Sequence, residues 1–161
     1  MSSRDEQVNH AQLLEGYEEA MSRLYKVYAA SFSDHRQTWQ KLAGDEIDHA
    51  DWMRALRARI EDGSVRMRAE RMVSPGQILD ALSRAGSEFD RADQGNISLA
   101  EAFRTAMRLE HEMLENGWFT VFDTDSAELK RVFQSLADET RKHLATLEGL
   151  SQDAAPPPKG G

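Results

Sequence analysis

The sequence predicts an all-α protein, a single bundle of four long helices with a shorter helix in the connection between the two pairs. Proline is confined to Pro75 and to 156–158, so the long segments between them lack the strongest helix breaker. Apolar residues recur at steps of three and four, which is the spacing of one helix face. No segment alternates polar and apolar residues as a strand would, and 161 residues is close to the usual size of one domain.

The turn residues divide the chain into five helices. The first is expected at about 5–32, the second ends at Gly63, the short one covers about 75–92, the next runs to about 122, and the last covers about 126–150. Two capping boxes mark helix starts, Ser74-Pro75-Gly76-Gln77 and Ser98 with Glu101. A long crossover from about 63 to 97 therefore joins two pairs of helices that have short turns within them.

Composition excludes several classes of function. A net charge of -8 and a pI near 5.1 argue against a nucleic-acid partner, because phosphate binding needs a clustered cationic face. The chain has no cysteine, so it offers no thiolate ligand, and no apolar run approaches the length of a membrane span. We therefore expect a cytoplasmic protein with one domain over 1–150 and a disordered tail over 151–161, which lacks any core pattern.

Each long helix has polar interruptions in its apolar stripe, and these indicate the chemistry. The four stripes are Leu14, Glu18, Met21, Tyr25, Tyr28; Leu42, Glu46, His49, Met53, Leu56; Phe103, Ala106, Glu110, Met113, Gly117; and Phe133, Leu136, Thr140, His143, Leu147, Leu150. Glu46 and His49 are three residues apart and share a helix face, so both can reach one ion. The histidines at 10, 35 and 111 lie off these stripes or near helix ends and are expected at the surface.

Several carboxylates converging in one core require neutralisation, because burying an isolated carboxylate costs several kcal/mol. A bound cation is one answer. Shared protons, or inward-reaching arginines such as Arg23, Arg104 or Arg108, are the competing answers. Oxygen and imidazole ligands without thiolate suit iron or manganese, and zinc also fits.

The sequence resembles the rubrerythrin branch of the ferritin-like superfamily over about residues 10–150. Glu18 followed by Tyr25, and then Leu42-Ala-Gly-Asp-Glu-Ile-Asp-His49, looks like the first half of that family's pattern. A shift of 94 positions (136 − 42) lays the segment 136–150 on 42–56 and matches the leading Leu-Ala, the histidine and the final leucine. Glu110 with Trp118 similarly stands where Glu18 with Tyr25 stands, although the spacing is eight rather than seven.

The chain departs from the family pattern at one of the metal ligands. Thr140 stands where the family has a second bridging glutamate, and the neighbouring Glu139 lies about 100° further round the helix. The additional helix-three glutamate of the family is also absent, since Met107 and Met113 flank Glu110.

The resemblance implies a ferritin-like four-helix bundle whose long crossover contains a short extra helix, and a non-haem iron site with two ions or one. The implied metal ligands are Glu18, Glu46, His49, Glu110 and His143. The implied reactions are peroxide or oxygen reduction and ferrous iron oxidation, with an external electron donor and a homodimeric assembly. Thr140 motivates the alternative, a ferritin-like binding or structural module whose degenerate site performs no catalysis, so the sequence leaves open whether the protein is an enzyme.

Overall fold

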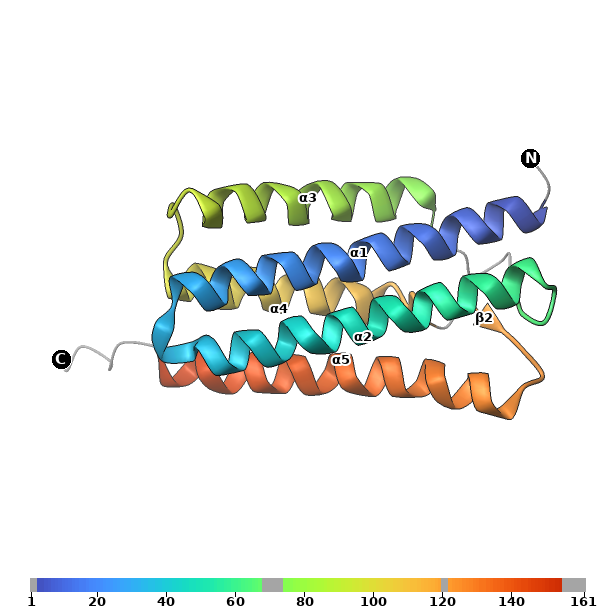
Figure 1. Ribbon diagram of the computed structural model, residues 1–161. Coiled ribbons are helices and arrows are strands. Elements are labelled where there is room, and N and C mark those ends of the chain that lie inside the picture. The colour runs from blue at the N-terminus through green and yellow to red at the C-terminus, as the bar shows by residue number, and fades with distance from the viewer. Residues whose placement is uncertain (1–2, 68–73, 120–121, 155–161) are drawn as a thin grey trace.

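The computed structural model describes residues 3–67, 74–119 and 122–154 (Figure 1), and over these residues the protein is all-helical apart from two short strands. The elements in chain order are α1 (Ser3–Ser31), a 3-10 turn η1 (Ser33–His35), α2 (Arg36–Glu61), β1 (Arg66–Met67), α3 (Pro75–Asp93), α4 (Leu99–Glu115), β2 (Phe122–Asp123) and α5 (Ala127–Asp153). The predicted all-α class is confirmed.

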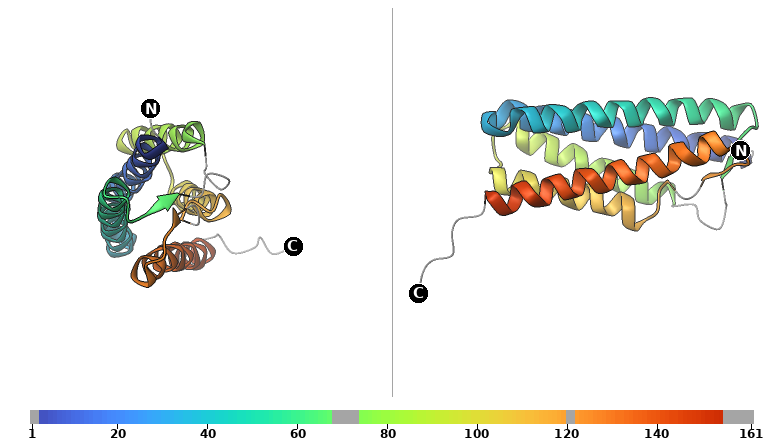
Figure 2. Two further views of the ribbon diagram at one scale, coloured as in Figure 1. Left: turned by 90° about the vertical axis from the view of Figure 1, so that its right-hand side faces the viewer. Right: turned by 90° about the horizontal axis from the view of Figure 1, so that it is seen from below.

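Four long helices surround one interior, and α3 lies outside them along α1 (Figures 1 and 2). The helices α1 and α2 form one antiparallel pair, and α4 and α5 form the other. Because α2 and α4 run in the same direction, the chain must travel back along the bundle between them, and α3 makes this return. The crossover therefore carries the extra helix that the sequence predicts.

The starts of α3 and α4 are fixed by the two predicted capping boxes. The backbone N–H of Gln77 donates to Ser74 Oγ at 3.2 Å, and the Gln77 side chain accepts from the Ser74 N–H at 3.0 Å. The Ser98 and Glu101 pair repeats this exchange at 3.2 and 2.8 Å. Each box satisfies backbone donors that the first helical turn leaves unpaired.

The end of α4 differs from the prediction. The helix stops at Glu115 rather than near 122, because Gly117 adopts a left-handed conformation with φ of 59°. The Trp118 N–H then donates back to the Met113 carbonyl at 3.3 Å, as in a Schellman termination. The chain beyond it forms β2, which pairs antiparallel with β1 through the registers Arg66–Asp123 and Met67–Phe122.

The other predicted boundaries lie close to the observed ones. Gly63, with φ of 85°, follows the end of α2 as expected. The last helix extends to Asp153, so it includes residues 151–153 of the expected tail. The remainder of the predicted tail lies outside the described residues.

An aromatic cluster fills the interior at one end of the bundle. Trp39 is fully buried, with its ring centroid 4.9 Å from that of Tyr28, 5.6 Å from that of Tyr25 and 5.3 Å from that of Phe103. These rings come from α1, α2 and α4, so their burial joins the two helix pairs. Within the described ranges, none of the helices is both long and apolar enough to cross a membrane.

Candidate metal centre

All five predicted ligands lie together in the interior of the bundle. Glu18 comes from α1, Glu46 and His49 from α2, Glu110 from α4 and His143 from α5, and all five are buried. They form two groups, Glu18 with Glu46 and His49, and Glu46 with Glu110 and His143. In each group the three candidate ligand atoms lie within 4.8 Å of one another. The helical periodicity of the sequence therefore predicts the convergence, whereas metal ligation itself stays a prediction.

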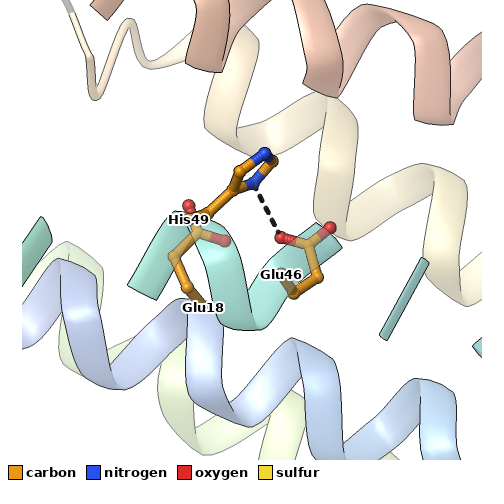
Figure 3. A group of neighbouring side chains, drawn as sticks. All are labelled: Glu18, Glu46 and His49. Carbon is orange, nitrogen blue, oxygen red and sulfur yellow. Dashed lines mark hydrogen bonds and ion pairs between the residues drawn. The ribbon is translucent and has the colours of Figure 1, made fainter. Parts of the chain in front are cut away.

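The first group is formed across the antiparallel α1–α2 pair (Figure 3). Glu18 extends from α1 toward Glu46 and His49, which lie one turn apart on the facing side of α2. The positions 18, 46 and 49 belong to the apolar stripes of their helices, so packing of those stripes forces the polar groups inward.

Glu46 is shared between the two groups. Its Oε2 atom lies 3.1 Å from His49 Nδ1, and its Oε1 atom lies 2.9 Å from His143 Nδ1. The same Nδ1 atom of His143 also lies 3.4 Å from Glu110 Oε1. The two imidazole rings stack with centroids 5.6 Å apart. Both histidines thus direct Nδ1 toward a single central carboxylate.

Each histidine directs its outer nitrogen, Nε2, toward an acid on the opposite helix. His49 Nε2 lies 2.8 Å from Glu139 Oε2 on α5, and His143 Nε2 lies 3.2 Å from Asp45 Oδ2 on α2. An acid on the outer nitrogen is the usual orienting partner of a metal-bound histidine. With the inner nitrogen on an ion, the outer N–H donates to this acid and fixes the tautomer.

The helical stripes do not predict the contacts of these two outer acids. Glu139 lies about 100° round the helix from position 140, and Asp45 lies equally far from Glu46. The internal repeat contains a signal for both, because the offset from Asp45 to Glu139 (139 − 45 = 94) equals that from His49 to His143 (143 − 49 = 94). The acid of each repeat contacts the histidine of the other.

The carboxylate of Glu18 has no hydrogen-bond donor on either oxygen among the described residues, although it is buried. Burial raises its pKa well above the usual range, and the negative charges of Glu46 and Glu110 raise it further. The pKa of Glu110 is raised to about 7 by burial and by Glu46, against the opposing effect of His143. Burial acts on Glu46 in the same direction, but hydrogen bonds from His143 and His49 outweigh it and lower its pKa.

The pKa values of the two histidines depend on the same two effects with opposite signs: burial lowers them and neighbouring carboxylates raise them. Burial alone would lower the pKa of His143, but the Glu110 and Glu46 carboxylates raise it to about 11. The pKa of His49 is likewise raised by Glu46 and Glu139 against the effect of burial. A carboxylate only accepts hydrogen bonds, so each ring has two acceptors facing it. Either both ring nitrogens carry protons or a cation replaces the inner proton.

Arginine does not neutralise the site. Arg23, Arg104 and Arg108 are all exposed, and Arg108 instead pairs with Glu88 at 3.4 Å. Within the described part of the chain, the ion pairs of the five candidate ligands involve only carboxylates and histidines. The arginine alternative is therefore wrong, which leaves protons or a cation.

Two further residues define the second group. Tyr25 donates its hydroxyl to Glu110 Oε1 at 2.6 Å, and burial raises the pKa of Tyr25 so that it stays a donor. Thr140 is fully buried and donates its hydroxyl to the carbonyl of Leu136 at 2.9 Å. The second group therefore has one carboxylate of its own, Glu110, together with the shared Glu46.

The other histidines differ in how far they match expectation. His111 is exposed, as predicted, and pairs with Glu115, whereas His35 is half-buried with its ring 5.4 Å from that of Phe103. His10 was expected at the surface, and this is wrong. It is fully buried on α1, neither ring nitrogen has a hydrogen-bond partner among the described residues, and burial lowers its pKa to about 4.

Comparisons of the chain with protein-family models, curated proteins and solved structures found no match. The resemblance suggested by the sequence pattern therefore receives no support from them. The functional argument rests on the side-chain geometry of the bundle interior. That geometry places nitrogen and oxygen donors where a metal ion could be held.

Proposed function

We propose that the chain is a rubrerythrin-like, ferritin-like bundle that holds non-haem iron between its four long helices. It would use this iron to reduce peroxide or oxygen, or to oxidise ferrous iron. The parallel α2 and α4 joined by one long crossover are the connectivity of ferritin-like folds. The two Glu-and-His groups around a shared glutamate resemble the carboxylate sites of such bundles.

The observation that carries the proposal is the environment of Glu18. The Glu18 carboxyl group is buried against the Glu46 carboxylate and has no donor from any other described residue, so the pair must either share a proton or bind a cation. Its neighbours Glu46 and His49 direct lone pairs into the same space when Nδ1 of His49 carries no proton. A cation in that space satisfies all three side chains at once.

The donor set favours iron for a redox function. Carboxylate and imidazole ligands without thiolate suit iron, manganese and zinc, and of these zinc has no redox chemistry. Bound ferrous iron would supply electrons to the oxidant. Reducing one hydrogen peroxide to two waters consumes two electrons and two protons, and each ferrous ion gives one electron. Two ions, or one ion together with the external donor, would therefore supply the pair, and the donor would then restore the ferrous state. The glutamates hold the ionic charge, and the histidines, oriented by Asp45 and Glu139, fix the geometry.

Metal analysis and single-turnover oxidation test the proposal together. The purified protein is loaded anaerobically with ferrous iron, its metal content is measured, and the absorbance of ferric iron is followed after peroxide is added. We expect bound iron and rapid oxidation in the native protein, and loss of both in Glu46→Ala and Glu46→Gln. Glu148→Gln is the control, because Glu148 is an exposed carboxylate on α5 outside the site. Equal iron content and oxidation in Glu46→Ala would exclude the site.

A second function, a binding or structural module without catalysis, is favoured by Thr140. A hydroxyl bonded to its own helix cannot bridge two ions as a carboxylate does, so the second group is short of one ligand. Thermal unfolding with and without ferrous or manganous ions separates the two functions. A ligand that binds only the native state must raise the melting temperature, so an unchanged temperature supports the module.

We also propose that the protein forms a homodimer, which rests only on the resemblance to rubrerythrin-like bundles. Size-exclusion chromatography with light scattering gives the mass directly. The mass of one chain, 18.2 kDa, would contradict the proposal.

A further inference from the structure

The candidate centre is enclosed almost completely by its own bundle. Glu18, Glu46, His49 and Glu110 each expose 1% or less of their surface, whereas His143 exposes 4%. Among the candidate ligands, His143 is therefore the one with the most surface exposed to solvent.

A small polar cavity lies directly outside His143, between α2 and α5. It has a volume of about 150 Å³ and is lined by Lys41, Asp45, Glu139, Lys142 and His143. Two of these residues are the outer acids that contact Nε2 of the two histidines. The polar cavity thus reaches from solvent to His143 and to Glu139, the acid that contacts Nε2 of His49.

A second opening between the same helices differs in kind. This apolar pocket, of about 160 Å³, is lined mainly by aliphatic and aromatic side chains, including Trp52, Leu129 and Phe133. None of the five candidate ligands lines it. The Trp52 ring, which lines this pocket, lies 5.6 Å from that of His49. The polar cavity is therefore the better route to the ligands.

Size and polarity limit what the polar cavity admits. At about 30 Å³ per water it holds roughly five waters, enough for a hydrogen peroxide molecule of about two waters in volume. A cavity of this volume could also accommodate one aromatic ring if it were apolar. Here a ring would remove water from two lysines and two acids without replacing their hydrogen bonds, which is unfavourable. The lining therefore selects small polar solutes.

We propose that the polar cavity is the route by which solutes reach the metal centre, and that it restricts the oxidant to hydrogen peroxide rather than organic hydroperoxides. This inference rests on the proposed function. Lys142 lines this cavity and is exposed, and among the described residues it forms no hydrogen bond or ion pair with a candidate ligand, so it controls access without belonging to the centre.

The route is tested first without any oxidant, through the rate at which the protein takes up Co²⁺. Cobalt in a nitrogen and oxygen site gives a visible absorbance that a stopped-flow instrument follows. Lys142→Trp places an indole in the polar cavity, so we expect uptake to slow by about tenfold or more with the same final absorbance. Lys130→Trp is the matched control, because Lys130 is an exposed lysine on the same helix that lines neither opening.

The selectivity is tested with ferrous protein and two oxidants, hydrogen peroxide and cumene hydroperoxide. In the native protein, hydrogen peroxide should oxidise the iron at least about tenfold faster than cumene hydroperoxide does, a difference of about 1.4 kcal/mol in activation free energy. Lys142→Ala enlarges the cavity and removes a charge, so it should raise the rate with cumene hydroperoxide while leaving the rate with hydrogen peroxide nearly unchanged. Opposite effects of Trp and Ala at one position would not arise from a general loss of folding.

The outcomes separate this inference from the proposed function. If the native protein binds Co²⁺ and its iron is oxidised by peroxide, but Lys142→Trp behaves as Lys130→Trp does, the route is wrong and the function stands. Equal rates with the two oxidants in the native protein overturn the selectivity. A native protein that takes up no Co²⁺ and no iron overturns the proposed function, and the route with it.

Discussion

At position 140 the chain has a threonine hydroxyl where the repeat, 94 residues earlier, has the Glu46 carboxylate. Glu46 faces both histidines, whereas the Thr140 hydroxyl bonds to the Leu136 carbonyl of its own helix. The first group therefore has two carboxylates and a histidine, and the second must share one of those carboxylates. We expect one ion to be held tightly and a second to be held weakly.

Thr140→Glu should supply the absent carboxylate. The number of tightly bound ions per chain, measured by elemental analysis after dialysis, is expected to rise from one to two. Thr140→Gln, which has the same size without the charge, should leave one. Without metal, Thr140→Glu should melt at a lower temperature, because a further buried carboxylate costs several kcal/mol when it is unpaired. An unchanged ion count in Thr140→Glu would mean that position 140 does not face the ions.

His10 provides a test that is independent of the metal. Its pKa is lowered from the usual 6.5 to about 4 by burial, so the unfolded chain binds a proton between these values and the folded chain does not. The stability that neutral His10 contributes is fully present above about pH 6.5 and is lost as the pH falls toward about 4, by up to about 3 kcal/mol.

His10→Leu should remove this pH dependence. Urea unfolding of both proteins at several pH values measures it: the native protein should lose more stability than His10→Leu between about pH 6.5 and 4. At neutral pH the variant should be equally stable or more stable, because it removes two buried nitrogens without partners. Parallel pH curves for the two proteins would contradict the lowered pKa.

At the scale of elements, Gly117 determines where α4 stops. Its φ of 59° lies in the region that other residues avoid at a cost of about 1–2 kcal/mol. Gly117→Ala should therefore lower the free energy of unfolding by about that amount. Gly149→Ala is the control, because Gly149 lies within α5 with nothing within 4 Å of an added Cβ, and it should be stabilising by about 0.5–1 kcal/mol. Urea unfolding of both variants measures these changes. An unchanged free energy of unfolding in Gly117→Ala would mean that the turn can relax to accommodate the side chain.

The helices show what the apolar periodicity predicts and what it does not predict. The spacing of three and four residues places Glu18, Glu110 and His143 on buried stripes, and all are buried. His10 continues the same stripe, four residues before Leu14, so the pattern contained its burial although its position near a helix end suggested the surface. Periodicity locates a residue on its own helix only.

Contacts between helices depend on side-chain reach, which the pattern does not contain. Asp45 and Glu139 lie about 100° from the stripes of their own helices, yet each contacts the histidine of the other helix because α2 and α5 lie side by side. The early end of α4 has another reason: the apolar spacing of the sequence continues to Gly117, beyond the end of α4 at Glu115, and only the left-handed conformation of Gly117 shows that the helix has already stopped.

For the whole molecule, the proposed metal binding must be coupled to proton release. The pKa of His143 is raised to about 11, so its ring holds a proton on both nitrogens at neutral pH without a cation, and burial raises the pKa of Glu18 as well. An ion competes for the same atoms, and raising the pH therefore favours the ion.

We expect the affinity for Co²⁺ to increase with pH between about 6 and 8, by roughly tenfold per pH unit for each proton released. Isothermal titration calorimetry in buffers of different ionisation enthalpy counts these protons directly. Glu148→Gln, outside the centre, should release the same number. Binding without proton release would contradict the raised pKa values.

The sharing of Glu46 also has a mechanical consequence. Glu46 belongs to the first helix pair, whereas Glu110 and His143 belong to the second, so an ion held by these three side chains cross-links the two halves of the chain. Amide hydrogen exchange along α5 should then slow when metal is bound, while exchange within the α1–α2 pair changes little. The ion would therefore act as a reversible cross-link between the two helix pairs. Its loss would let the two pairs separate more readily.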